Sequence, residues 1–184
     1  MPTVFAHAAV AATFARIYSR ERSMPARLWL LAIVCAVAPD LDSVLGIPGV
    51  DLWNDLFAHR GFTHSLTFAA LLAALVMAVA FRDIAVNTRA WWRHWLFFFT
   101  VTASHGVLDA LTSGGPGVAF FSPFSRETYF FPWRPIAVSP LRLSFFSARG
   151  VAAVMSELLW IGAPIALVLG VRALWQYRTR ARAP

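Results

Sequence analysis

Histidine and aspartate residues recur in closely spaced pairs at the ends of apolar stretches, and both residue types are common ligands of divalent metal ions. Asp40 and Asp42 lie two residues apart after the helix-breaking Pro39, where irregular backbone can direct both carboxylates inward. His105 and Asp109 are four residues apart in an apolar stretch, so on a helix they share one face. Two ligands one helical turn apart can bind the same metal ion.

Further histidines extend this set. His59 and His64 bracket a polar string that precedes another apolar stretch, and His7 lies near the start of the first one. The complete set of ligand candidates is His7, Asp40, Asp42, His59, His64, His105 and Asp109. Imidazole with carboxylate suits zinc, with manganese or iron as alternatives. Six or seven such ligands are more than one ion needs, and they would suit a pair of ions about 3.5–4 Å apart, the arrangement that supports hydrolysis; we expect one or two ions. Glu157 is a further candidate for this site.

Each of these residues also has a plainer interpretation. A histidine in an apolar helix often only hydrogen-bonds to a neighbouring helix, and the aspartate pair could cap a helix or lie in a solvated loop. His105 and Asp109 could hydrogen-bond within one helix. Ionisable groups inside membrane segments are nevertheless costly and usually functional. We exclude His94, which lies beside Arg93 at the opposite end of its stretch, and we interpret Asp51 and Asp55 as loop carboxylates.

The elements that must position these ligands are apolar helices. Five apolar stretches cover residues 4–17, 28–38, 65–81, 91–111 and 151–175. A helix needs about 20 residues to cross about 30 Å of hydrocarbon, a length that the last three stretches approach and the first two do not. We therefore predict an all-α fold, a polytopic membrane bundle of four to five helices in a single domain over residues 1–184. Whether residues 4–17 cross the membrane stays open.

The composition supports a membrane location. Hydrophobic residues make up 59% of the 184 residues and charged residues only 14%, whereas a soluble domain carries about 25% charged residues. The net charge of +7 comes from arginines at the ends of the apolar stretches, so we expect a bilayer and no nucleic-acid partner. The first apolar stretch contains His7 and has no basic segment before it, so we expect no signal peptide.

The arginines also give an orientation. Residues 16–27, 82–93 and 172–182 contain 11 of the 16 arginines and share one side if every stretch crosses, so that side is predicted to be cytoplasmic. The N-terminus then lies outside and the C-terminus inside. All seven ligand candidates fall on the outer side, although the arginine count does not use them. Loops 40–62 and 113–150 share that side, and the second, rich in Pro, Gly and aromatic residues, is predicted to be a structured lid.

Arginines on the ligand side provide candidate anion contacts. Arg60 lies between two candidate ligands, and Arg126 and Arg134 lie in the predicted lid. Guanidinium groups bind phosphate and carboxylate in a bidentate way, so we expect these three arginines to bind substrate. Contact with lipid head groups is the alternative.

The motifs resemble those of a known family. His7, Pro39-Asp40-Leu41-Asp42, the string His59-Arg60-Gly61-Phe62-Thr63-His64-Ser65, and His105-Gly106-Val107-Leu108-Asp109 followed by Thr112 are similar to the YdjM-like family of bacterial inner-membrane proteins, described as metal-dependent hydrolases and as a domain of unknown function. The resemblance covers most of the chain and implies a membrane-embedded hydrolase with a metal centre. A looser likeness to the zinc-dependent phospholipase C fold, limited to the His105–Asp109 spacing and the ligand types, points to phosphate esters.

The resulting hypothesis is a metal-dependent hydrolase of the inner membrane. It would cleave an ester, preferably a phosphoester, in a lipid or lipid-linked substrate, with the active site on the outer face. One of Asp40 and Asp42 would act as general base, and Arg60 would stabilise charge in the transition state. A metal or ion transporter and a non-catalytic metal-binding scaffold remain as alternatives. A transporter needs polar residues toward the cytoplasmic side, where the apolar stretches are nearly pure Ala, Leu and Val.

Overall fold

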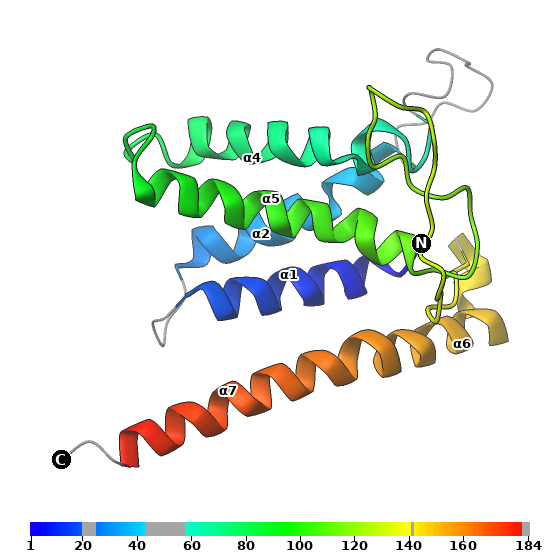
Figure 1. Ribbon diagram of the computed structural model, residues 1–184. Coiled ribbons are helices and arrows are strands. Elements are labelled where there is room, and N and C mark those ends of the chain that lie inside the picture. Colours follow the sequence, from blue (N-terminus) through cyan, green and yellow to red (C-terminus); the bar gives the residue numbers. More distant parts are fainter. Residues whose placement is uncertain (20–24, 43–57, 141, 182–184) are drawn as a thin grey trace.

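A computed structural model describes residues 1–19, 25–42, 58–140 and 142–181 (Figure 1). Within these ranges the chain is all-helical, and two isolated bridges between loop segments take the place of strands. The α-helices are α1 (Val4–Tyr18), α2 (Ala26–Val37), α4 (Leu66–Ala80), α5 (Arg89–Ala110), α6 (Ala148–Glu157) and α7 (Ala163–Ala181), with a π-helical turn (Leu158–Gly162) joining the last two. Short 3-10 helices cover Ala38–Asp40 (η1), Phe62–His64 (η2) and Arg142–Phe146 (η3).

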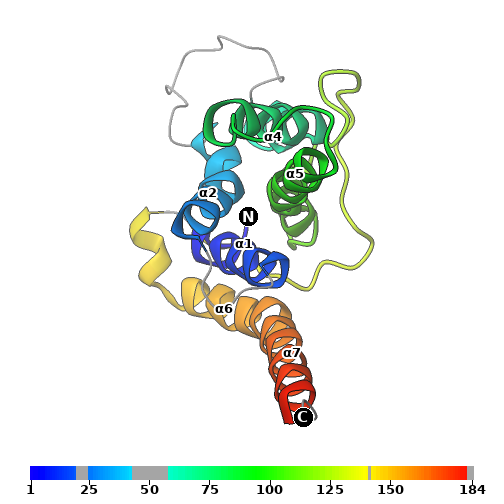
Figure 2. The ribbon, with the colours of Figure 1, turned by 90° about the vertical axis from the view of Figure 1, so that its left-hand side faces the viewer.

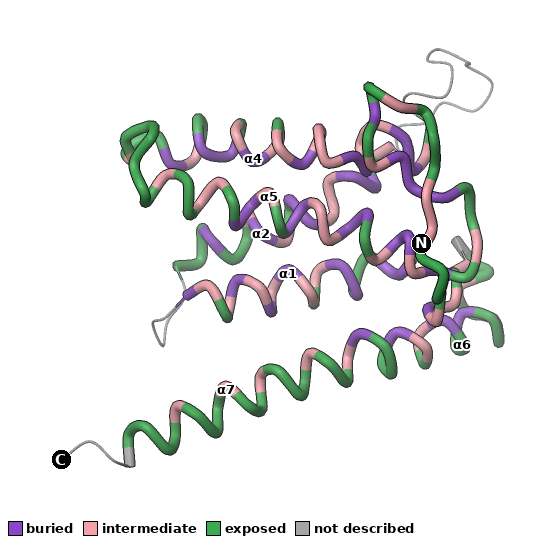
Figure 3. The backbone as a smooth tube through the Cα atoms, in the orientation of Figure 1, coloured by how far each residue is buried: buried purple, intermediate pink, exposed green. Residues whose placement is uncertain are grey.

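Helices α1, α2, α4 and α5 pack around a common centre, with α7 outside α1 (Figure 2). Alanines fill much of the contact surface, among them the fully buried Ala11, Ala32 and Ala73. Small side chains let helix backbones approach closely, which is the usual way in which membrane helices associate. Phe98 and Met77 fill the space that remains. The buried sides of these helices face one another, whereas α7 is exposed along most of its length (Figure 3).

The helix ends gather at two opposite ends of the bundle. The N-terminus, η1 after α2, η2 before α4, the loop after α5, and α6 lie at one end (Figure 1). The α4–α5 link and the C-terminal ends of α1 and α7 lie at the other (Figures 1 and 2). This is the grouping expected when successive apolar stretches run in opposite directions. The assignment of the two ends to the outer and cytoplasmic sides stays a prediction.

One described helix is long and apolar enough to cross a membrane, namely the continuous helix of 33 residues from Ala148 to Arg180. Helices α1 and α4 are apolar but have only 15 residues each. At 1.5 Å per residue they measure about 22 Å, which is less than the hydrocarbon thickness of about 30 Å. The all-helical fold is therefore confirmed for the described residues, and the polytopic arrangement stays a prediction.

Two polar contacts attach the long helix to the ends of α1. The backbone amide and hydroxyl of Thr3 donate hydrogen bonds to the carboxylate of Glu157. At the other end of α1, the guanidinium of Arg172 donates to the carbonyls of Ile17 and Ser19, at 3.0 and 2.9 Å. An acid at the N-terminus of a helix and a base at its C-terminus both complement the helix dipole. The α1 helix is thus held at both ends by one partner.

In the described residues, the predicted lid runs as an irregular loop to Pro140 and then as the 3-10 helix η3; its predicted end at residue 150 was too late, because α6 begins at Ala148. Its backbone amide at Ala119 donates to the carbonyl of Arg60, and its carbonyl at Phe120 accepts from the amide of Leu66. These bonds tie the loop to η2 and the start of α4. Of the other predicted outer loop, residues 43–57 lie outside the described ranges, and so do Asp51 and Asp55.

Candidate metal centre

Four elements bring five of the predicted ligands into one buried cluster. Helix α1 carries His7, η1 carries Asp40, η2 carries His64, and α5 carries His105 and Asp109. The regular α2 helix ends at Val37, and Pro39 occupies the following 3-10 turn, so the backbone changes direction just before Asp40. All five side chains are buried, and those of His105 and Asp109 have no exposed surface.

The distances within this cluster are close to those between neighbouring ligand atoms of a metal ion. Nε2 of His105 lies 3.1 Å from Nε2 of His64 and 3.3 Å from Oδ1 of Asp40. Nε2 of His64 lies 3.5 Å from Oδ2 of Asp109 and 3.7 Å from Oδ1 of Asp40. Nε2 of His7 lies 3.7 Å from Oδ1 of Asp109. In a tetrahedral zinc site with bonds of about 2.0–2.1 Å, neighbouring ligand atoms are about 3.3 Å apart.

The other ring nitrogens of two histidines are already engaged. Nδ1 of His105 lies 2.7 Å from the carbonyl oxygen of Ala36, to which it donates a hydrogen bond. Nδ1 of His64 lies 3.0 Å from Oγ1 of Thr63, and this hydroxyl in turn donates to Asp42 at 2.7 Å. In the neutral rings, with the proton of each on Nδ1, the two Nε2 atoms present lone pairs to the centre of the cluster. Metal-bound histidines are held in this way, by a hydrogen bond from the nitrogen that does not bind the metal.

Two further atoms of the cluster fit a bound cation. Nε2 of His7 and Oδ1 of Asp109 are buried, and neither has a hydrogen-bond partner in the described part of the chain. A buried polar atom without a partner costs about 1–3 kcal/mol, and such atoms are rare unless a ligand completes them. The rings of His7 and His105 stack with centroids 3.8 Å apart, so His7 joins the cluster beside His105. The donor set, three imidazoles and two carboxylates, fits a divalent metal ion.

Arg60 forms an ion pair with Asp109. Its side chain is buried, with Nε 3.1 Å from Oδ2 of Asp109, while its other nitrogens donate to Thr112 and to the carbonyl of Gly114. At Gly115, where φ is +94°, an added Cβ would lie 2.7 Å from the guanidinium, so glycine leaves room for it. These contacts indicate that Arg60 positions Asp109. Direct contact of Arg60 with substrate stays a prediction.

Asp42 and His59 form a pair at the rim of the cluster. Nδ1 of His59 lies 2.9 Å from Oδ1 of Asp42, and the His59 side chain is 33% exposed. Burial alone would raise the pKa of the Asp42 carboxyl, but hydrogen bonds with His59 and His64 hold it well below its usual value. Burial alone would lower the pKa of His64, but Asp40 and Asp42 raise it to about 9. Asp40, His59 and His64 also lie close enough together to share an ion.

The remaining predicted residues lie away from this cluster or face other partners. Arg126 and Arg134 are exposed, and Arg134 lies over the ring of Phe130, so their role in substrate binding stays a prediction. Glu157 accepts hydrogen bonds from Thr3 and therefore serves α1 instead of joining the ligands. His94 hydrogen-bonds within the first turns of α5, at the opposite end of that helix from His105, which agrees with its exclusion.

Sequence reasoning missed the groups that orient the ligands. The backbone carbonyl of Ala36 carries no signal in a sequence, because every residue has one. Thr63 was a weak signal, since it lies next to His64 and its hydroxyl can reach both His64 and Asp42. Thr112 lies three residues after Asp109, where its hydroxyl donates to the Asp109 carbonyl at 2.7 Å and accepts from Arg60.

Comparison with known proteins agrees with the motif resemblance. Residues 1–179 match the family described as YdjM inner membrane protein. The chain is 36% identical to "Inner membrane protein YbcI" of Escherichia coli (strain K12), over 97% of this chain and 99% of the relative. No solved structure matches significantly. Both protein comparisons support a location in the bacterial inner membrane, and the chain belongs to the YdjM inner membrane protein family.

Proposed function

We propose that the protein is a metal-dependent hydrolase of the inner membrane that cleaves a phosphoester or another ester in a lipid or lipid-linked substrate. The observation that carries the proposal is the buried group formed by His7, Asp40, His64, His105 and Asp109, in which ligand atoms lie 3.1–3.7 Å apart. Such spacing and such ligands fit zinc, and manganese or iron are alternatives.

The residues of the chain have distinct tasks in this proposal. A divalent ion bound there would polarise the ester and activate a water for attack. His64 and His105 hold their lone pairs toward the centre because their Nδ1 atoms are engaged. Asp42 orients His59 at the exposed rim, and this pair accepts the proton that water loses as its oxygen joins the phosphorus or carbonyl carbon. As the bond between the phosphorus or carbonyl carbon and the alcohol oxygen breaks, the leaving alcohol takes up the proton from this pair.

The surroundings of the cluster support the proposed substrate and membrane side. The cluster lies at the end of the bundle where the long helix begins, so in a membrane it would lie near the surface of the bilayer. The arginine count favours the outer face, with multiple crossings and a cytoplasmic C-terminus. Arg126 and Arg134 are exposed on the loop that covers this end and are available to an anionic head group.

A metal-binding scaffold is the second candidate. The burial of the five ligands favours it, because structural metal sites are closed whereas catalytic sites keep one position open for water. The rim pair of Asp42 and His59 favours the enzyme, because a purely structural site has no use for a partly exposed histidine held by a carboxylate.

Metal content followed by activity tests the proposal. Elemental mass spectrometry of the detergent-purified protein should find about one or two equivalents of zinc, manganese or iron. The double variant His64→Ala, Asp109→Ala should lose them, whereas His94→Ala, at the far end of α5, should keep them. Phosphoester and lipid hydrolysis is then measured with the same three proteins. A wild-type protein without metal after repletion would exclude the proposal, and bound metal without hydrolysis would favour the scaffold.

A further inference from the structure

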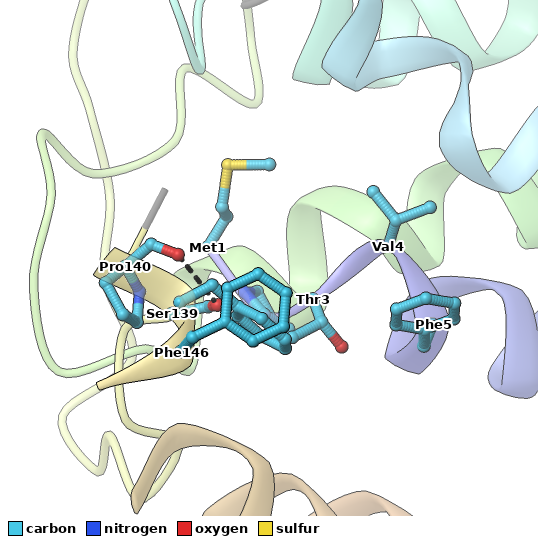
Figure 4. A pocket seen from close by; sticks show the side chains of 9 residues that line it. Met1, Thr3, Val4, Phe5, Ser139, Pro140 and Phe146 are labelled. Carbon is cyan, nitrogen blue, oxygen red and sulfur yellow. Dashed lines mark hydrogen bonds between the residues drawn. The ribbon is translucent and has the colours of Figure 1, made fainter. Parts of the chain in front are cut away.

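An apolar groove opens beside the N-terminal end of α1 (Figure 4). It has a volume of about 270 Å³, and its walls come from residues 1–5, from Ser139 and Pro140, and from the end of η3. The side chains of Phe5 and Phe146 line it and remain 78% and 83% exposed. The groove is therefore a largely apolar surface with no partner in the described part of the chain.

The groove adjoins one end of the candidate membrane span. Phe145 and Phe146 lie just before Ser147, the residue that precedes the long helix beginning at Ala148. At 1.5 Å per residue this helix of 33 residues measures about 50 Å, more than the hydrocarbon thickness of about 30 Å, so in a membrane its ends would reach the head-group layer. In a glycerolipid the acyl chains start from ester bonds in this same layer, with the apolar chain on one side and the polar head group on the other.

The groove also adjoins the metal centre. Thr3 lines the groove and is one turn of α1 before His7. Met1 and Pro2 line it as well, and Pro2 is fully buried. The segment from Met1 to Thr3 thus leads from the groove directly into α1, the helix that carries His7.

We propose that this groove binds one acyl chain of a membrane glycerolipid and so places the ester linkage of that lipid beside the metal centre. The proposal rests on the proposed hydrolase function and names its substrate class. The volume is just below the range of about 300–1,000 Å³ that is usual for pockets holding a whole small ligand. It therefore suits a segment of one chain, with the rest of the lipid left in the bilayer. The apolar walls provide hydrophobic contact without requiring a specific head group.

Photolabelling in vesicles tests this site. The full-length protein is reconstituted into vesicles of phosphatidylethanolamine and phosphatidylglycerol that contain a trace of phosphatidylglycerol with a diazirine in one acyl chain. Adducts are mapped by mass spectrometry. We expect adducts on Phe5 and Phe146 that saturate and are displaced by unlabelled phosphatidylglycerol. Adducts on the lipid-exposed Leu167 of α7 should rise in proportion to the probe, as ordinary bilayer contacts do.

Two variants give the matched comparison. Val4→Trp fills the groove and should lower the saturable labelling about tenfold, because the chain loses the burial of about two methylene groups. Leu167→Trp adds a tryptophan on α7, away from the groove, and should leave the saturable labelling unchanged. Labelling of the groove that never saturates, or that Val4→Trp does not reduce, would overturn the proposal. So would cysteine cross-linking between two copies through Phe146→Cys, since a second copy would then cover the groove. Metal content is measured on the same samples. Saturable labelling of a protein that binds no metal would exclude the proposed hydrolase function but support the acyl-chain site.

Discussion

Gly106 offers a direct test of the packing that places His64 in the cluster. Gly106 follows the ligand His105 on α5, at the point where this helix touches η2. A Cβ added at Gly106 would lie 2.8 Å from the backbone carbonyl oxygen of His64, and 3.3 Å from side-chain atoms of Phe120 and Val118. Backbone cannot move aside as a flexible side chain can, so Gly106→Ala must displace His64 itself.

The size of the displacement follows from these distances. Ordinary contact begins at 3.4 Å, so the carbonyl oxygen of His64 must move by about 0.6 Å. Metal–ligand distances tolerate only about 0.2 Å. We expect zinc affinity to fall by about 10–100-fold, the usual effect of disturbing a group that holds a ligand. The clash should cost about 1–3 kcal/mol of unfolding free energy, against a gain of about 1 kcal/mol from the higher helix propensity of alanine.

Gly170→Ala is the matched control. Gly170 is on α7, and an added Cβ there meets nothing within 4 Å. This variant should keep wild-type zinc affinity and be slightly more stable. Zinc affinity is measured in detergent by competition with a chromophoric chelator, and stability by the melting temperature of the metal-free protein. If Gly106→Ala bound zinc as tightly as wild type and melted as high as Gly170→Ala, the close contact between α5 and η2 would be refuted.

Four further outcomes are expected. Arg60→Gln leaves Asp109 as a buried carboxylate without its ion pair, so the melting temperature should fall sharply, by an amount equivalent to about 3–5 kcal/mol; a change below 1 kcal/mol would show that the pair is unimportant. Asp42→Asn replaces the carboxylate that accepts hydrogen bonds from Thr63 and His59 with a weaker acceptor, so zinc affinity should drop about 10–100-fold in the chelator assay. Unchanged affinity would contradict the proposal that Asp42 orients these groups. Glu157→Gln removes the negative charge at the N-terminus of α1, and thermal melting should show a loss of about 0.5–2 kcal/mol with zinc stoichiometry preserved; loss of zinc would instead make Glu157 a ligand. Because the pKa of His64 is raised from 6.5 to about 9, its protonation stabilises the metal-free protein fully below pH 6.5 and is lost as the pH rises through 9. Melting temperatures in chelator should therefore decline over this range, and zinc affinity should increase as the proton leaves; a flat profile would argue against the interactions with Asp40 and Asp42.

The sequence predicted much of the candidate site because local spacing carries geometric information. His105 and Asp109 are four positions apart, which places both on one face of any helix, and both do enter the same cluster. The order of the apolar stretches predicted which helix ends lie together, because successive helices joined by short links run in opposite directions; the arginine count predicted only which end is cytoplasmic. The partners of Glu157 were not predictable, because nothing near Glu157 in the chain indicates that Thr3, 154 residues away, will meet it.

By itself, then, the sequence determined the types of the candidate ligands, their order along apolar helices and the family, because these depend on residue identity and on separations within one element. Only the tertiary structure decided which atoms face the centre and which groups hold them there. His7 reaches Asp109 because α1 packs beside α5, and Arg60 turns inward because its backbone is left-handed and Gly115 leaves room for its guanidinium. The carbonyl of Ala36 directs His105 only because α2 ends beside α5. Such contacts join residues far apart in the chain, and their distances are set by the packing of whole helices.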